Sequence, residues 1–160
     1  RAHIMTMHQN SELLSELDRL FGDRSNFTID PDLASQGTVS DYDIMISDWS
    51  GAALEFAFGL ERPVLYIDVP RKVNNPEYER IGIDPIEVKL RADIGAIISP
   101  DKLRDAPRSV AELCGNPSRW KERVRDLRTK WVYNVGSSGG VGASHIASLV
   151  SSEIPVMPGN

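Results

Sequence analysis

Apolar residues recur along the chain with two different spacings, which predict alternating helices and strands. Leucines three and four residues apart between Ser11 and Phe21 form one face of a helix, with Asn10 or Ser11 as its cap and Gly22 as its stop. Apolar runs at 42–47, 64–69 and 95–99 are short and bounded by turn residues, as in the strands of a parallel sheet. A further short strand is predicted at 26–29.

The order of these segments predicts the fold class. Helices are expected at 52–60, 105–113, 117–131 and about 141–152, whereas the polar segment 71–94 is expected to be a long loop with one helical turn. Strands that alternate with helices indicate an α/β fold with a parallel sheet flanked by helices. The run at 42–47 is the expected central strand. One domain over 1–153 and a flexible tail at 154–160 are predicted.

Composition excludes several classes of protein. With 160 residues, 41% of them hydrophobic, the chain can bury a core and is not a disordered segment. No apolar run approaches the roughly 20 residues of a membrane-spanning helix. The one cysteine, Cys114, cannot form an internal disulfide, and no acidic or Cys/His cluster has the spacing of a metal site, so no resident metal is expected. Because no internal disulfide is possible, we expect the chain to reside in a reducing compartment.

Charge is unevenly distributed around a net value of −5. Residues 1–70 contain four Lys/Arg and twelve Asp/Glu, whereas 117–131 contains six and two. In that basic helix Lys121, Arg125 and Arg128 form a stripe beside an apolar face. The stripe is either a solvated surface or a contact for anionic lipid or a phosphate-bearing polymer. Nucleic acid is not an expected partner, because the pI is near 5.2 and no exposed aromatic residues are expected among the basic ones.

The turn after the run 42–47 is the candidate ligand site. Ligands of parallel α/β sheets bind beyond the carboxyl ends of the strands, where helix N-termini point their free N–H groups outward. The segment from Ser47 through Asp48 to Ala52 lies at such a position. Gly51 removes a side chain that would block a phosphate, and Ser50 can cap the helix or donate its hydroxyl to a phosphate oxygen. These features suit a diphosphate.

Glu55 is the one charged residue in the apolar helix 52–60, and it lies one turn after Gly51 on the same side. Its two carboxylate oxygens can accept hydrogen bonds from both hydroxyls of a ribose. A phosphate at the helix start and a ribose at Glu55 would together form a nucleotide site. The alternative is that Glu55 only pairs with Arg62 or another surface cation.

The stretch Asp43-Ile-Met-Ile-Ser-Asp-Trp-Ser-Gly-Ala-Ala-Leu-Glu-Phe-Ala, followed by Arg62-Pro-Val-Leu-Tyr, resembles the CDP-glycerol glycerophosphotransferase family of teichoic-acid-type polymer synthesis. The resemblance covers about residues 41–70. It implies a Rossmann-like C-terminal domain of a GT-B fold, in which the serine turn and the helix carboxylate bind the donor nucleotide. More distant GT-B glycosyltransferases share both features.

Two flanking segments resemble the same family less closely. His3 falls at the position of a family Arg/Lys-Pro-His-Pro motif, without either proline, and is by that resemblance the catalytic candidate that steadies the diphosphate. Ser137 and Ser138 fall in a C-terminal stretch that the resemblance implies to be phosphate-binding, and His145 lies near the place of a family arginine. His8 has no supporting context.

The resemblance implies transfer of glycerol phosphate from CDP-glycerol to a hydroxyl of a lipid-linked or polymer acceptor, at the inner face of the cell membrane, for cell-wall synthesis. The donor diphosphate could bring Mg²⁺ with it. The general base and acceptor site are expected in an N-terminal GT-B half outside these 160 residues, so this segment alone is expected to bind nucleotide without turnover. The alternatives are a GT-B glycosyltransferase with a nucleotide-sugar donor and a non-catalytic, partner-binding α/β domain.

Overall fold

A computed structural model describes residues 4–30, 39–71, 73 and 75–153. The chain divides into two compact units, Arg1–Tyr42 and Asp43–Asn160, where the sequence predicts one domain over 1–153. The predicted flexible tail at 154–160 lies outside the described residues.

The first unit contains the helices α1 (Ile4–Gln9) and α2 (Ser11–Phe21) and the 3₁₀ turn η1 (Val39–Asp41). Helix α2 confirms the leucine pattern and ends at Gly22, whose N–H donates to Asp18 O at 2.7 Å. The strand predicted at 26–29 is wrong, because these residues have no strand structure. Phe27 instead closes a turn by donating its N–H to Arg24 O, and its ring packs 5.4 Å from that of Phe21. Phe27 is therefore held by local contacts with Phe21 and Arg24 and not by pairing with a strand.

The second unit is built on a three-stranded parallel sheet of β1 (Met45–Ser47), β2 (Val64–Ile67) and β3 (Gly95–Ile98). The strand order is β1-β2-β3, so the predicted α/β class with a parallel sheet is confirmed. The prediction that the run at 42–47 is the central strand is wrong for this sheet, because β2 lies between the other two. Gly95 permits the close pairing, since a Cβ at that position would collide with the carbonyl oxygen of Val64.

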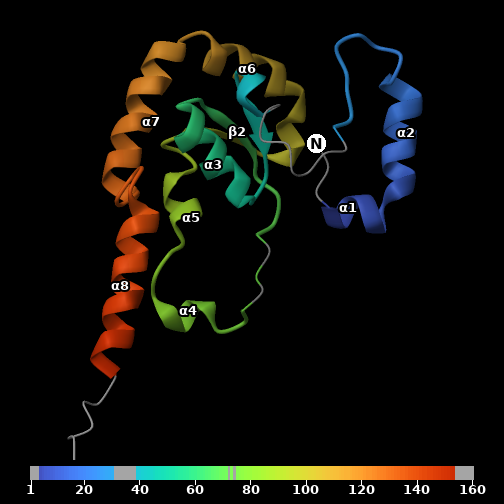
Figure 1. Cartoon of the computed structure of the whole chain (residues 1–160). Coiled ribbons are helices and arrows are strands. Elements are labelled where there is room, and N and C mark those ends of the chain that lie inside the picture. Colours follow the sequence, from blue (N-terminus) through green and yellow to red (C-terminus); the bar gives the residue numbers. More distant parts are fainter. Residues whose placement is uncertain (1–3, 31–38, 72, 74, 154–160) are drawn as a thin grey trace, which may run out of the picture. The chain divides into compact units, whose positions relative to one another are not determined.

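Helices connect and cover the strands (Figure 1). Helix α3 (Gly51–Leu60) joins β1 to β2, and the predicted long loop between β2 and β3 contains two short helices, α4 (Tyr78–Ile81) and α5 (Ile86–Leu90). After β3 follow the 3₁₀ segment η2 (Pro100–Asp105) and the helices α6 (Ala106–Cys114), α7 (Pro117–Trp131) and α8 (Ser138–Glu153). The buried apolar core consists of Ala53, Phe56, Ala57, Val64, Leu65, Tyr66, Leu90, Ile94, Leu113 and Val124.

Two arginines of the basic stripe attach α7 to the end of α3. Glu61, in the left-handed conformation that ends α3, accepts hydrogen bonds from Arg125 at 2.8 and 3.2 Å and from Arg128 at 2.8 Å. Arg128 also donates to Phe58 O at 2.5 Å, which caps a free carbonyl of α3. The predicted basic surface is therefore partly an internal contact, and of the three stripe residues only Lys121 has no described partner.

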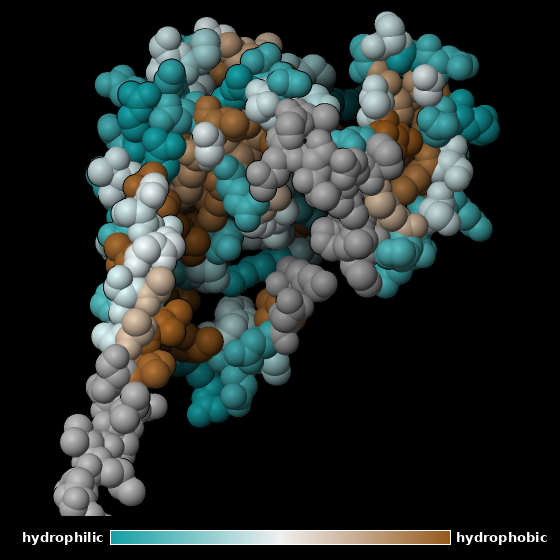
Figure 2. Space-filling view, viewed as in Figure 1, coloured by the Kyte–Doolittle hydropathy of each residue, from teal (hydrophilic) through white to brown (hydrophobic). Residues whose placement is uncertain are grey.

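No helix in the described part of the chain is long and apolar enough to cross a membrane. Helix α8 nevertheless exposes Ile146, Leu149 and Val150, and apolar surface is visible along its lower part in Figure 2.

Candidate functional site

The turn between β1 and α3 has the geometry of a capped helix start. Ser47 ends β1 half-buried, and Asp48 is exposed directly after it. Ser50 has an extended backbone, with φ −103° and ψ 133°, and its Oγ accepts a hydrogen bond from Ala52 N at 3.3 Å. Ser50 is thus the N-cap that the sequence predicts. No described residue accepts its hydroxyl hydrogen, which could therefore be donated to an anion.

Gly51, the first residue of α3, is exposed and open to a ligand. A Cβ built at this position would meet nothing within 4 Å, so the glycine is not required by packing inside the unit. Among the described residues the Gly51 N–H has no acceptor. A ten-residue helix adds the positive end of its dipole here, and the free N–H together with that dipole favours an anion.

Glu55 is exposed one helical turn beyond Gly51. It forms no hydrogen bond or ion pair with any residue that the structure describes, including Arg62. The interpretation that Glu55 serves only as the partner of a surface cation is therefore not supported. Its carboxylate is available to accept hydrogen bonds from a ligand.

Trp49 anchors the turn through contacts with residues that are distant in the sequence. Its indole Nε1 donates to Val69 O at 2.7 Å, which attaches the turn after β1 to the end of β2. The guanidinium of Arg91 stacks on the Trp49 ring, with Cζ 3.7 Å from the ring centre, and lies 4.9 Å from that of Tyr66. Arg91 is 4% exposed, and its Nη1 pairs with Asp68 Oδ1 at 2.9 Å. These contacts fix the position of the turn.

The segment after β2 adds a second cation to Trp49. Arg71 lies 6.0 Å from the Trp49 ring centre and 5.1 Å from that of Tyr78. The sequence places Arg71 and Tyr78 in a polar loop but gives no sign of these contacts. Aromatic and arginine residues that follow strand ends are the weak signal that could have suggested them.

Tyr66, beside this cluster on β2, does not supply a base. Burial raises the pKa of Tyr66 to about 12, an effect that Arg91 partly opposes. Its hydroxyl therefore keeps its proton at neutral pH.

The remaining predicted residues are not joined to this turn by any described hydrogen bond. Ser137 donates its Oγ to Asn134 O at 3.3 Å and, with His145, lines a shallow groove along α8. Ser138 begins α8 and is exposed, as is His8 in α1. His3 lies outside the described residues.

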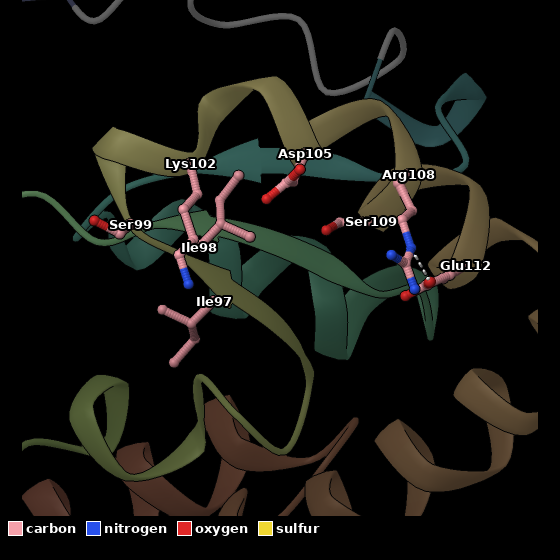
Figure 3. A pocket seen from close by; sticks show the side chains of 8 residues that line it. All are labelled: Ile97, Ile98, Ser99, Lys102, Asp105, Arg108, Ser109 and Glu112. Atoms are coloured by element: carbon pink, nitrogen blue, oxygen red, sulfur yellow. Dashed lines mark hydrogen bonds and ion pairs between the residues drawn. The ribbon is translucent and has the colours of Figure 1, made fainter.

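A second hollow lies at the carboxyl end of β3, against η2 and α6 (Figure 3). Its polar lining combines both charges, and Arg108 turns toward Glu112, with Nε 2.9 Å from Oε1. Ser99 caps η2 by accepting from Asp101 N at 3.4 Å. Of the polar residues that line this hollow, only Arg108 and Glu112 form a pair with each other among the described residues. Its lining residues are Ile97, Ile98, Ser99, Lys102, Asp105, Arg108, Ser109 and Glu112.

Within the described ranges, no group of three or more His, Cys, Asp or Glu side chains is placed to hold a metal ion. Comparison of the chain with protein-family models, with curated proteins and with solved structures gives no match.

Proposed function

We propose that this chain binds the nucleotide diphosphate of a donor, as the donor-nucleotide-binding domain of a CDP-glycerol glycerophosphotransferase. The observation that carries the proposal is the open start of α3, where neither the Gly51 N–H nor Glu55, one turn further along the same face, has a partner among the described residues. The resemblance of residues 41–70 to that family supports the choice of donor. The GT-B assignment is part of the same proposal.

In the proposed reaction an acceptor hydroxyl attacks the phosphorus that carries glycerol. The new P–O bond forms, the bond between this phosphorus and the bridging oxygen breaks, and CMP leaves with that oxygen. The Gly51 N–H and the Ser50 hydroxyl would stabilise the negative charge on the leaving phosphate, while Glu55 would hold the ribose. Any Mg²⁺ would arrive with the diphosphate.

The proton of the acceptor hydroxyl needs a base, which Tyr66 does not supply because it keeps its proton. Glu55 is assigned to the ribose in this proposal. The base and the acceptor site belong to a partner GT-B domain in this proposal, and the acceptor is lipid-linked at the inner membrane face. The 160 residues alone would bind the donor without turning it over. Glycerophosphate transfer by this chain alone would contradict that division of roles.

The test is the thermal midpoint of the chain with CDP-glycerol, CMP and UDP-glucose, with and without Mg²⁺. A ligand that binds only the folded state at 100 times its Kd adds about 2.7 kcal/mol of stability. The proposal expects an increase with cytidine ligands that Glu55→Gln abolishes. Glu122→Gln is the matched control, because Glu122 is an exposed helix glutamate on α7.

The other outcomes separate the alternatives. A larger shift with UDP-glucose than with CDP-glycerol would favour a nucleotide-sugar glycosyltransferase. No shift with any nucleotide would contradict the proposal and favour a partner-binding domain.

A further inference from the structure

Arg71 and Arg91 both lie beside the ring of Trp49, and among the described residues Arg91 has a counter-ion, Asp68, whereas Arg71 has none. Its guanidinium lies beside the rings of Trp49 and Tyr78, and no described residue accepts a hydrogen bond from it. The side chain is only half-buried, so its donors can reach a ligand from solvent. Aromatic rings restrict the position of a guanidinium without consuming its N–H groups.

The second arginine beside Trp49, Arg91, is almost completely buried. Its side chain is 5% exposed, and Nε and Nη2 are buried without a hydrogen-bond partner. Burial of a cation with unsatisfied donors is costly, and here Asp68 and the ring of Trp49 offset part of that cost. Arg91 stacks on the Trp49 ring at 3.7 Å, and Arg71 lies further from the same ring, at 6.0 Å.

Arg71 carries a positive charge at this turn that no described carboxylate pairs with. Arg71 and Arg91 contribute two positive charges, and Asp68, the partner of Arg91, cancels one of them. Asp48 and Glu55 are exposed near the same turn and add two negative charges, so an anion would be held by the guanidinium donors of Arg71 and not by a net positive charge. Arg71 lies 6.0 Å from the ring centre of Trp49, which stands two residues before Gly51, and the Gly51 N–H has no acceptor among the described residues.

We propose that Arg71 binds a phosphate oxygen of the nucleotide ligand, and that Trp49 and Arg91 position it. This inference rests on the proposed nucleotide site and adds a residue to it. The guanidinium supplies the bidentate, charge-assisted contact that a helix N-terminus lacks. The group that Arg71 recognises is the diphosphate, and this recognition does not depend on the nucleobase.

The experiment measures binding of CDP, CMP and inorganic pyrophosphate to the whole chain by isothermal titration calorimetry. Arg71→Gln should weaken CDP and pyrophosphate about 10- to 100-fold, as expected for loss of a hydrogen bond to a charged group. CMP should be weakened less, because it lacks the second phosphate. Arg71→Lys should recover part of the affinity, since it keeps the charge without the planar fork.

Arg80→Gln is the matched control, because Arg80 lies in the same segment, is exposed and is paired with Glu77 at 2.7 Å. The inference is overturned if Arg71→Gln binds CDP and pyrophosphate as the unchanged chain does. It is also overturned if Arg71→Gln weakens all three ligands equally, because Arg71 would then only support the turn. If the unchanged chain binds pyrophosphate but neither cytidine nucleotide, the nucleotide proposal fails, and the pyrophosphate series still tests Arg71. If it binds none of the three, both proposals fall.

Discussion

Replacement of Trp49 tests whether the stack beneath the β1–α3 turn stabilises the fold. Trp49→Phe removes the Nε1 donor, which leaves Val69 O without its 2.7 Å partner, but it keeps an aromatic face for Arg91. Trp49→Leu removes both the donor and the face. The two variants therefore separate the hydrogen bond from the stacking.

The structure sets the size of each effect. A typical hydrogen bond contributes a net stability of about 1 kcal/mol, which is the expected cost of Trp49→Phe. A cation–π contact that is shielded from water is worth about 2 kcal/mol, and Arg91 is 4% exposed, so Trp49→Leu should cost about 3 kcal/mol. At roughly 2–4 °C per kcal/mol for a chain of this size, the thermal midpoint should fall by about 2–4 °C and 6–12 °C.

The assay is thermal unfolding followed by circular dichroism, repeated in an Arg91→Met background. If the stacking is real, the cost of Trp49→Leu should fall by about 2 kcal/mol when Arg91 is absent. Equal midpoints for Trp49→Phe and Trp49→Leu, or a double-mutant coupling near zero, would refute the reasoning.

Three further predictions concern the rest of the second unit. Leu65→Ala, at a fully buried position of the central strand, should cost about 2–5 kcal/mol in urea unfolding, whereas Leu103→Ala at an exposed position should be near neutral. Gly59→Ala should stabilise the chain by about 0.5–1 kcal/mol in the same assay, because Gly59 lies inside α3 with open space around its Cα. The hydrogen bond from Arg125 lowers the pKa of Glu61, so the pair adds stability above the unfolded carboxyl pKa and loses it as pH falls through the lower folded value. Urea midpoints measured from pH 6 to pH 3 should thus fall less steeply for Glu61→Gln; parallel curves would contradict this.

The sequence predicts most of the helices and the parallel sheet, because these depend on local spacing. Helix α7 begins at the predicted Pro117 and ends at the predicted Trp131. Strand order is a different matter, since it depends on which edges pair. The apolar run at 42–47 resembles a central strand, yet Ile46 is 55% exposed on an outer strand, and β2 lies at the centre with three buried residues.

The candidate site shows the same division between local and distant contacts. Ser50, Gly51 and Glu55 were identified from sequence because a cap, a small residue and a carboxylate one turn later form a pattern within six positions. The stack beneath them was missed, since Val69 and Arg91 lie 20 and 42 positions after Trp49 and share no periodic pattern with it.

The turn and the contacts of Trp49 and Arg91 that support it have different roles. Ser50, Gly51 and Glu55 offer a hydroxyl hydrogen, an N–H and a carboxylate that no described residue pairs with, so these groups can bind a ligand. The support is held within the unit by the hydrogen bond from the indole N–H to Val69 O and by the ion pair of Arg91 with Asp68. A ligand that binds the open groups would gain from a turn already held in place, because ordering a free turn on binding costs affinity. Loosening the support by Trp49→Leu should therefore weaken nucleotide binding without altering any group that the nucleotide contacts.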